Sequence, residues 1–105
     1  MDRIHTLQDW LAGKPDDRFA RYSLALELNK AGRTDDALTE LRELLRRHPG
    51  SGAGHYQHGL LLLEAEREAE ARAAWLEGLA RLDGVDDPEA RRSIGEIRRA
   101  LADLD

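Results

Sequence analysis

One helical pattern occurs twice in the amino-acid sequence, and the two copies are 34 residues apart. Small or aliphatic residues occupy most of the matching positions. They are Leu24, Ala25, Leu28, Ala37, Leu41, Leu44, Leu45 and Pro49 in the first copy, and His58, Gly59, Leu62, Ala71, Trp75, Gly78, Leu79 and Asp83 in the second. Self-similarity at a period of roughly 20–50 residues indicates stacked repeats, because a single repeat cannot bury its apolar face alone.

Composition indicates that the repeated unit is helical. Ala, Leu, Glu and Arg dominate, aromatic residues make up only 5% of the chain, and no segment alternates apolar and polar residues for long enough to form a strand. The sequence therefore predicts an all-α protein of about six helices. We expect helices near residues 2–11, 17–31, 34–48, 53–65, 69–82 and 87–101.

Short signals mark several helix ends. Asp16 or Asp17 can cap the second helix, Thr34 the third, and Asp87, followed by a proline, the sixth. The glycine-rich residues 50–54 predict a loose and mobile connection before the fourth helix.

The two copies resemble the tetratricopeptide repeat, a 34-residue helix–turn–helix unit. The residues that carry the likeness are Leu24, Ala25, Leu28, Gly32, Ala37, Leu41, Leu44 and Pro49, and then Gly59, Leu62, Ala71, Trp75 and Gly78. The resemblance implies a right-handed superhelical stack of antiparallel helix pairs in one domain, residues 1–105. Its parts would be a partial repeat helix at 1–14, repeats at 18–51 and 52–85, and a capping helix at 87–103.

Five positions depart from the family pattern. Arg21 and His55 stand where the family usually has a large aromatic residue, and His58 stands where it has Leu. Glu66 replaces the turn glycine and Asp83 the closing proline. The 34-residue register continues through all of these changes.

The resemblance also implies a binding surface, because the first helices of such repeats line a concave face that can hold an extended peptide or a helix. The residues that it places on this partner-binding groove are Phe19, Tyr22, Ser23, Leu26, Asn29, Lys30, Tyr56, Gln57, Leu60 and Leu63, with Arg92 on the capping helix.

Two features of this surface have alternative interpretations. Residues 60–63 are four consecutive leucines, which sweep about 300° around a helix, so they cannot all point in one direction. Either neighbouring helices bury all four, or Leu60 joins Tyr22, Leu26 and Tyr56 in an apolar floor for a partner. The arginines of the last helix form either a solvated face or a basic wall that prefers acidic segments; they are Arg91, Arg92, Arg98 and Arg99.

Other function classes find little support. The chain has no cysteine, and its formal net charge of −5 argues against nucleic-acid binding. His55 and His58 share a helix face, but two imidazoles rarely hold zinc alone. No catalytic constellation, cofactor motif, signal peptide or apolar membrane-spanning run is visible. We therefore expect a cytoplasmic, non-enzymatic adaptor or scaffold that binds another protein; the alternative is a homodimer that self-associates through its groove or stack ends.

Overall fold

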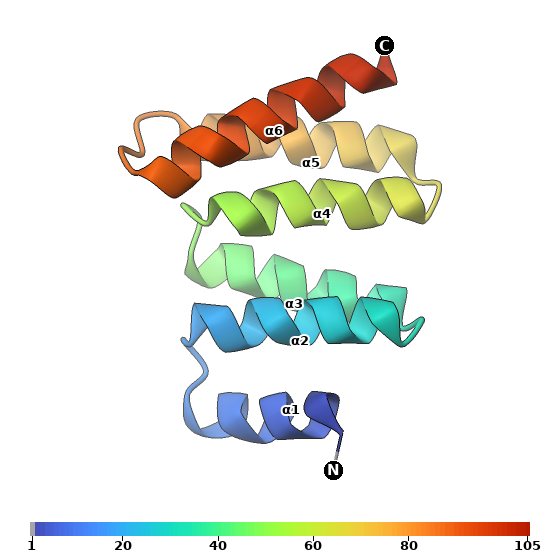
Figure 1. The fold of residues 1–105 in the computed structure, drawn as a ribbon, viewed down its shortest axis with the longest axis vertical. Coiled ribbons are helices and arrows are strands. Elements are labelled where there is room, and N and C mark those ends of the chain that lie inside the picture. The colour runs from blue at the N-terminus through green and yellow to red at the C-terminus, as the bar shows by residue number, and fades with distance from the viewer. Residues whose placement is uncertain (1) are drawn as a thin grey trace. The chain divides into compact units, whose positions relative to one another are not determined.

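The computed structural model describes residues 2–105, and this span contains six α-helices (Figure 1). Their bounds are α1 Arg3–Gly13, α2 Arg18–Lys30, α3 Thr34–Arg47, α4 Gly52–Glu64, α5 Glu68–Leu82 and α6 Pro88–Leu104. No β-strand occurs among the residues described, so the all-α prediction is confirmed.

The chain divides into two compact units, residues 1–48 and 49–105. In the first unit α2 packs against both α1 and α3, and in the second α4, α5 and α6 all pack against one another. Short turns connect consecutive helices within each unit, so that these neighbours run in opposite directions (Figure 1). The finer division of the chain into repeats and a cap stays a prediction.

Side-chain caps start several of the helices. The Asp17 carboxylate accepts a hydrogen bond from the Ala20 backbone N–H at 3.0 Å, and the Asp87 carboxylate accepts one from Ala90 at 2.7 Å. Each bond satisfies a backbone donor that has no partner inside its helix. The expected caps at Asp17 and Asp87 are therefore confirmed.

The expected cap at Thr34 is wrong, because the N-cap residue of α3 is Arg33 and it makes no side-chain capping bond. Gly32 has a φ of 78°, and the Arg33 backbone N–H then donates to the Leu28 carbonyl at 2.9 Å. This closing bond of α2 places Arg33 directly before α3, so Thr34 is already its first helical residue.

The second copy closes its first helix in the same way without a glycine. Glu66 has a φ of 62°, and the Arg67 backbone N–H donates to the Leu62 carbonyl at 2.9 Å. Glu66 lies 34 residues after Gly32, so a residue with a side chain holds the left-handed conformation that Gly32 adopts at no steric cost.

The prediction of a loose connection at residues 50–54 is also wrong. Ser51 is buried, and its hydroxyl oxygen accepts a hydrogen bond from the Gly54 backbone N–H at 3.1 Å, so α4 begins at Gly52. A Cβ atom at Gly52 would lie 2.5 Å from the Ser93 hydroxyl oxygen. The glycine is therefore required for the close approach of α4 and α6 rather than for mobility.

Arg21 and His55, the two polar residues at the usual aromatic position, make equivalent hydrogen bonds. An Arg21 guanidinium N–H donates to the Pro15 carbonyl at 2.8 Å, and the His55 ring Nε2 donates to the Pro49 carbonyl at 2.8 Å. Both the side chains and the prolines are 34 residues apart in the sequence. Each polar side chain therefore ties the start of its helix to the preceding proline, within its own unit.

Candidate functional site

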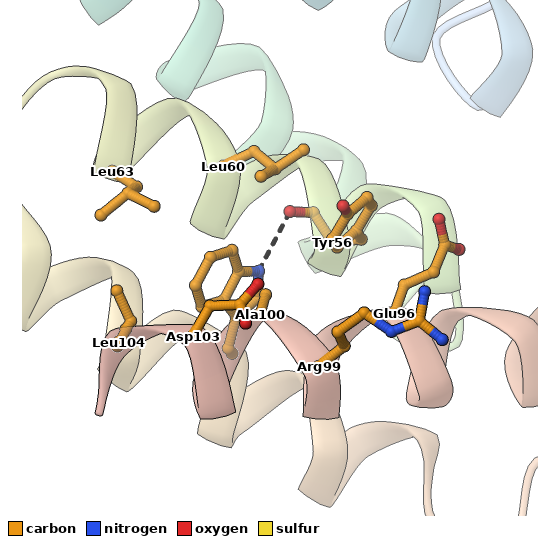
Figure 2. Close-up of a pocket in the computed structure, with 9 residues that line it drawn as sticks. Tyr56, Leu60, Leu63, Glu96, Arg99, Ala100, Asp103 and Leu104 are labelled. Carbon is orange, nitrogen blue, oxygen red and sulfur yellow. Dashed lines mark hydrogen bonds between the residues drawn. The ribbon is translucent and has the colours of Figure 1, made fainter.

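A groove lies between α4 and α6 in the second unit (Figure 2). Its volume is about 310 Å³. The residues that line it are Tyr56, Leu60, Leu63, Trp75, Glu96, Arg99, Ala100, Asp103 and Leu104. We call Tyr56, Leu60 and Leu63 the groove floor, and the three charged residues of α6 the groove rim.

The base of the groove depends on a close contact between α4 and α5. A Cβ atom at Gly59 would lie 2.0 Å from the Trp75 ring nitrogen, so only glycine leaves room for the indole. Trp75 has no exposed surface, and its ring N–H donates to the Tyr56 carbonyl at 3.1 Å. Packing against Gly59 and the hydrogen bond to Tyr56 therefore hold the indole in one position.

This fixed indole supports the first residue of the groove floor. The Tyr56 ring stacks on Trp75 with 6.5 Å between ring centroids and 21° between ring planes. Tyr56 stays half-buried, so its ring can contribute contact area to a second molecule. Figure 2 shows Tyr56, Leu60 and Leu63, the groove floor, side by side along α4.

The four consecutive leucines divide between core and groove. Leu61 and Leu62 are 1% and 3% exposed, whereas Leu60 and Leu63 are half-buried and line the groove. The interpretation that neighbouring helices bury all four leucines is therefore wrong, whereas the interpretation that Leu60 joins Tyr22, Leu26 and Tyr56 in an apolar floor stays a prediction. The run places one pair of leucines in the core and leaves the other pair partly accessible.

Helix α6 supplies the opposite side of the groove. Ala100 and Leu104 extend the apolar surface, while Glu96, Arg99 and Asp103 form the rim (Figure 2). Two carboxylates and one guanidinium make this edge mixed in charge, so the expected basic wall does not describe it. The other interpretation of the arginines, a solvated face, agrees with the exposure of Arg91, Arg92, Arg98 and Arg99.

The structure brings together three of the five groove residues that the sequence analysis placed in this unit, namely Tyr56, Leu60 and Leu63. Gln57 is half-buried on α4 and Arg92 is exposed on α6, and neither lines the groove. The sequence analysis missed the lining residues that follow Arg92 on α6. A helical spacing of three and four residues from Arg92 through Glu96 to Arg99 was the available signal.

The other expected groove residues lie on α2 in the first unit. Phe19 is 75% exposed, and the Arg18 guanidinium lies 5.4 Å from the centre of its ring. Lys30 is exposed, and its ammonium nitrogen lies 3.9 Å from Glu27. The half-buried members of the set are Tyr22, Ser23, Leu26 and Asn29. Their role in binding stays a prediction.

His55 belongs to α4, and its buried side chain packs against α5. It is 4% exposed, and a Cβ atom at Gly78 would lie 2.9 Å from the His55 Cβ. Burial lowers the pKa of the His55 imidazole, with the Arg81 charge acting in the same direction and the Pro49 carbonyl and Glu77 opposing it. No group of three or more potential metal ligands comes together in residues 2–105.

Across this described part of the chain, no helix combines the length and the apolar character needed to cross a bilayer.

Comparison with known proteins identifies the family. The sequence profile described as "Tetratricopeptide repeat" matches residues 1–62, which is more than half of the chain. No curated protein sequence matches the chain.

Among solved structures, the chain is similar to a tetratricopeptide repeat domain protein from Salinibacter ruber. The two chains share 24% sequence identity and superpose with a TM-score of 0.70, over 83% of this chain and 93% of the other. This likeness concerns the fold, and it agrees with the paired helices described above. On the profile match and the fold together, this chain belongs to the tetratricopeptide repeat family.

Proposed function

We propose that this chain is a non-enzymatic interaction module whose groove between α4 and α6 holds a helix or an extended segment of another protein. Membership of the tetratricopeptide repeat family supports the general role of a protein–protein interaction module. The observation that carries the specific proposal is the groove floor, where Leu60 and Leu63 remain half-buried beside the fully buried Leu61 and Leu62.

The size and chemistry of the groove support an amphipathic segment as its occupant. A volume of about 310 Å³ lies at the lower end of the range of ligand pockets, which suits one or two large apolar side chains. The groove rim would then contact charged residues of the partner that flank its apolar side chains. A basic residue of the partner would face Glu96 or Asp103, and an acidic residue would face Arg99. Such a rim contributes more to orientation than to affinity.

Helix α2 supports a related proposal for the first unit. Tyr22 and Leu26 stand 34 residues before Tyr56 and Leu60, and both are half-buried. Tyrosine is enriched at protein interfaces because it offers apolar contact area with a polar tip. We propose that α2 presents a second contact surface for the same kind of partner.

A matched pair of leucine variants tests the groove. Leu60→Gln places an amide in the groove floor, whereas Leu76→Gln makes the same change on α5 at a leucine that is 54% exposed and outside the groove. Peptides selected from a random library on the unmodified protein would be measured against both variants by calorimetry. We expect Leu60→Gln to weaken binding about tenfold or more and Leu76→Gln to leave it unchanged.

Folding of both variants would be checked by circular dichroism before binding is compared. Equal affinity of the selected peptides for Leu60→Gln and the unmodified protein would refute the groove as the binding site. Loss of binding in both variants would also refute it, because the effect would then not belong to the groove.

A further inference from the structure

The edge of α6 that borders the groove carries charges that alternate in sign. Arg92, Glu96, Arg99 and Asp103 follow one another at spacings of three and four residues, and we call them the α6 stripe. At about 100° of rotation per residue, their side chains leave the helix within an arc of about 60°. The helix therefore presents a nearly straight row of positive, negative, positive and negative groups.

Within residues 2–105 the charges of the α6 stripe form no ion pairs, although similarly spaced charges on other helices do. Intrahelical ion pairs at the same spacings form between Arg46 and Glu43, between Arg67 and Glu70, and between Arg81 and Glu77. Across residues 2–105, no ion pair within 4 Å joins two members of the α6 stripe or links one of them to another residue. The neighbouring Arg91, which lies off the stripe, pairs with Asp86 at 2.7 Å.

An alternating row is complementary to its own antiparallel copy. When two such helices run in opposite directions about a two-fold axis near residues 97 and 98, Arg92 faces Asp103 of the second copy and Glu96 faces Arg99 of the second copy. Symmetry repeats both contacts, as an isologous interface requires. A shift of one step along the row would place like charges opposite each other, and a shift of two steps would keep only two of the four contacts, so the pattern favours this register.

Gly95 lies beside the α6 stripe, about 40° around the helix from Arg99. It lies inside α6 and is exposed, and a Cβ atom there would meet nothing within 4 Å. Glycine in a helix interior lowers stability relative to alanine, and no contact within the chain requires it here. Together with the exposed Ala102, it leaves room for the backbone of a second helix to approach.

We propose that the α6 stripe is a self-association surface, through which two copies of this chain form an antiparallel, two-fold symmetric contact. Three of its four members, Glu96, Arg99 and Asp103, also form the groove rim, so the proposal goes beyond the proposed function in naming a second copy of the chain as an occupant of this edge. Because its contacts are solvent-exposed ion pairs, the dimer is weak and sensitive to salt. Because such a dimer would cover the groove rim, it would compete with a peptide for the groove.

Two charge reversals test the register. Glu96→Arg places a positive charge opposite Arg99 of the second copy, and Arg99→Glu places a negative charge opposite Glu96 of the second copy. Each variant alone therefore carries two like-charge contacts in the dimer. Its dimerisation should be weaker than that of the unmodified chain by about tenfold or more. A mixture of the two variants restores an opposite charge at every contact and should dimerise as well as the unmodified chain.

Sedimentation equilibrium from about 10 µM to about 1 mM, at about 50 mM and about 500 mM salt, measures this directly. Arg98→Glu, an exposed change on the same helix off the stripe, is the control and should leave dimerisation unchanged. A chain that stays monomeric throughout this range overturns the proposal, as does a mixture that associates no better than its components. Peptide binding to the groove floor is tested separately with Leu60→Gln at low micromolar protein concentration, so failure of the dimer is distinguishable from failure of the proposed function.

Discussion

Replacing Gly59 by alanine adds one methyl group, and it should strongly disrupt the packing of the second unit. The new Cβ would lie 2.0, 2.2 and 2.4 Å from the Nε1, Cε2 and Cδ1 atoms of Trp75. Favourable contacts between such atoms lie at about 3.5–4.0 Å, so one of the two helices or the indole must move by more than an ångström. Trp75 is fully buried, so moving its indole would disturb the side chains packed around it.

The expected cost follows from three contributions. Overpacking of a core typically costs about 1–3 kcal/mol, and a contact this short belongs at the upper end. Displacing the indole also breaks its hydrogen bond to the Tyr56 carbonyl, which costs about 1 kcal/mol. The higher helix propensity of alanine returns about 1 kcal/mol. We therefore expect Gly59→Ala to lower the free energy of unfolding by about 3 kcal/mol.

Gly95→Ala is the matched control, because it makes the same chemical change in a helix interior where nothing lies within 4 Å. Only the higher helix propensity of alanine then affects stability, so the free energy of unfolding of this variant should rise by up to about 1 kcal/mol. Thermal and urea unfolding at low micromolar concentration would be followed by circular dichroism and by tryptophan fluorescence. The melting temperature of Gly59→Ala should fall by roughly 10 °C or more. A Gly59→Ala protein as stable as Gly95→Ala would refute the packing described for α4 and α5.

Three further changes test other parts of the fold. Glu66→Gly should raise stability by about 1 kcal/mol in urea unfolding, because a glycine adopts the positive φ of this turn without steric cost; unchanged or reduced stability would contradict this. Burial lowers the pKa of His55, so the unfolded chain takes up a proton at higher pH than the folded chain does. The stability due to neutral His55 is therefore fully present above about pH 6.5 and is lost as the pH falls below that value, and His55→Gln should flatten the dependence of the melting temperature on pH in this window; equal slopes for the two proteins would refute the assignment. Arg21→Met should cost about 1–3 kcal/mol in the same urea assay, because it removes a 2.7 Å ion pair to Glu40 from a guanidinium that is 12% exposed; a neutral effect would contradict it.

The 34-residue period was enough to predict most of the fold. It predicted six helices in the observed order, but it did not predict that Gly59 and Trp75 meet where α4 and α5 cross. It could not predict how Ser51 and Gly52 start α4, because glycine-rich sequence is typical of loops and the need for glycine appears only when Ser93 of α6 is in place. The positive φ of Glu66 could not be predicted either, because glutamate rarely adopts this conformation.

The candidate site was predicted on one side only. The resemblance to the tetratricopeptide repeat placed Tyr56, Leu60 and Leu63 on the binding surface, and all three line the groove. Helix α6 has no second copy within the sequence for comparison, so its charges were assigned to a solvated face or a basic wall. Which of them border the groove, including Glu96 and Asp103, became clear only from the packing of α6 against α4.

The most direct test of the proposed binding site is an NMR titration of the isotope-labelled protein with a peptide selected on the unmodified chain. The account predicts that the largest amide and methyl shifts fall on the groove, at Tyr56, Leu60, Leu63, Ala100 and Leu104, and that they vanish in Leu60→Gln. Shifts centred instead on the outer face of α5, around Leu76, would contradict it.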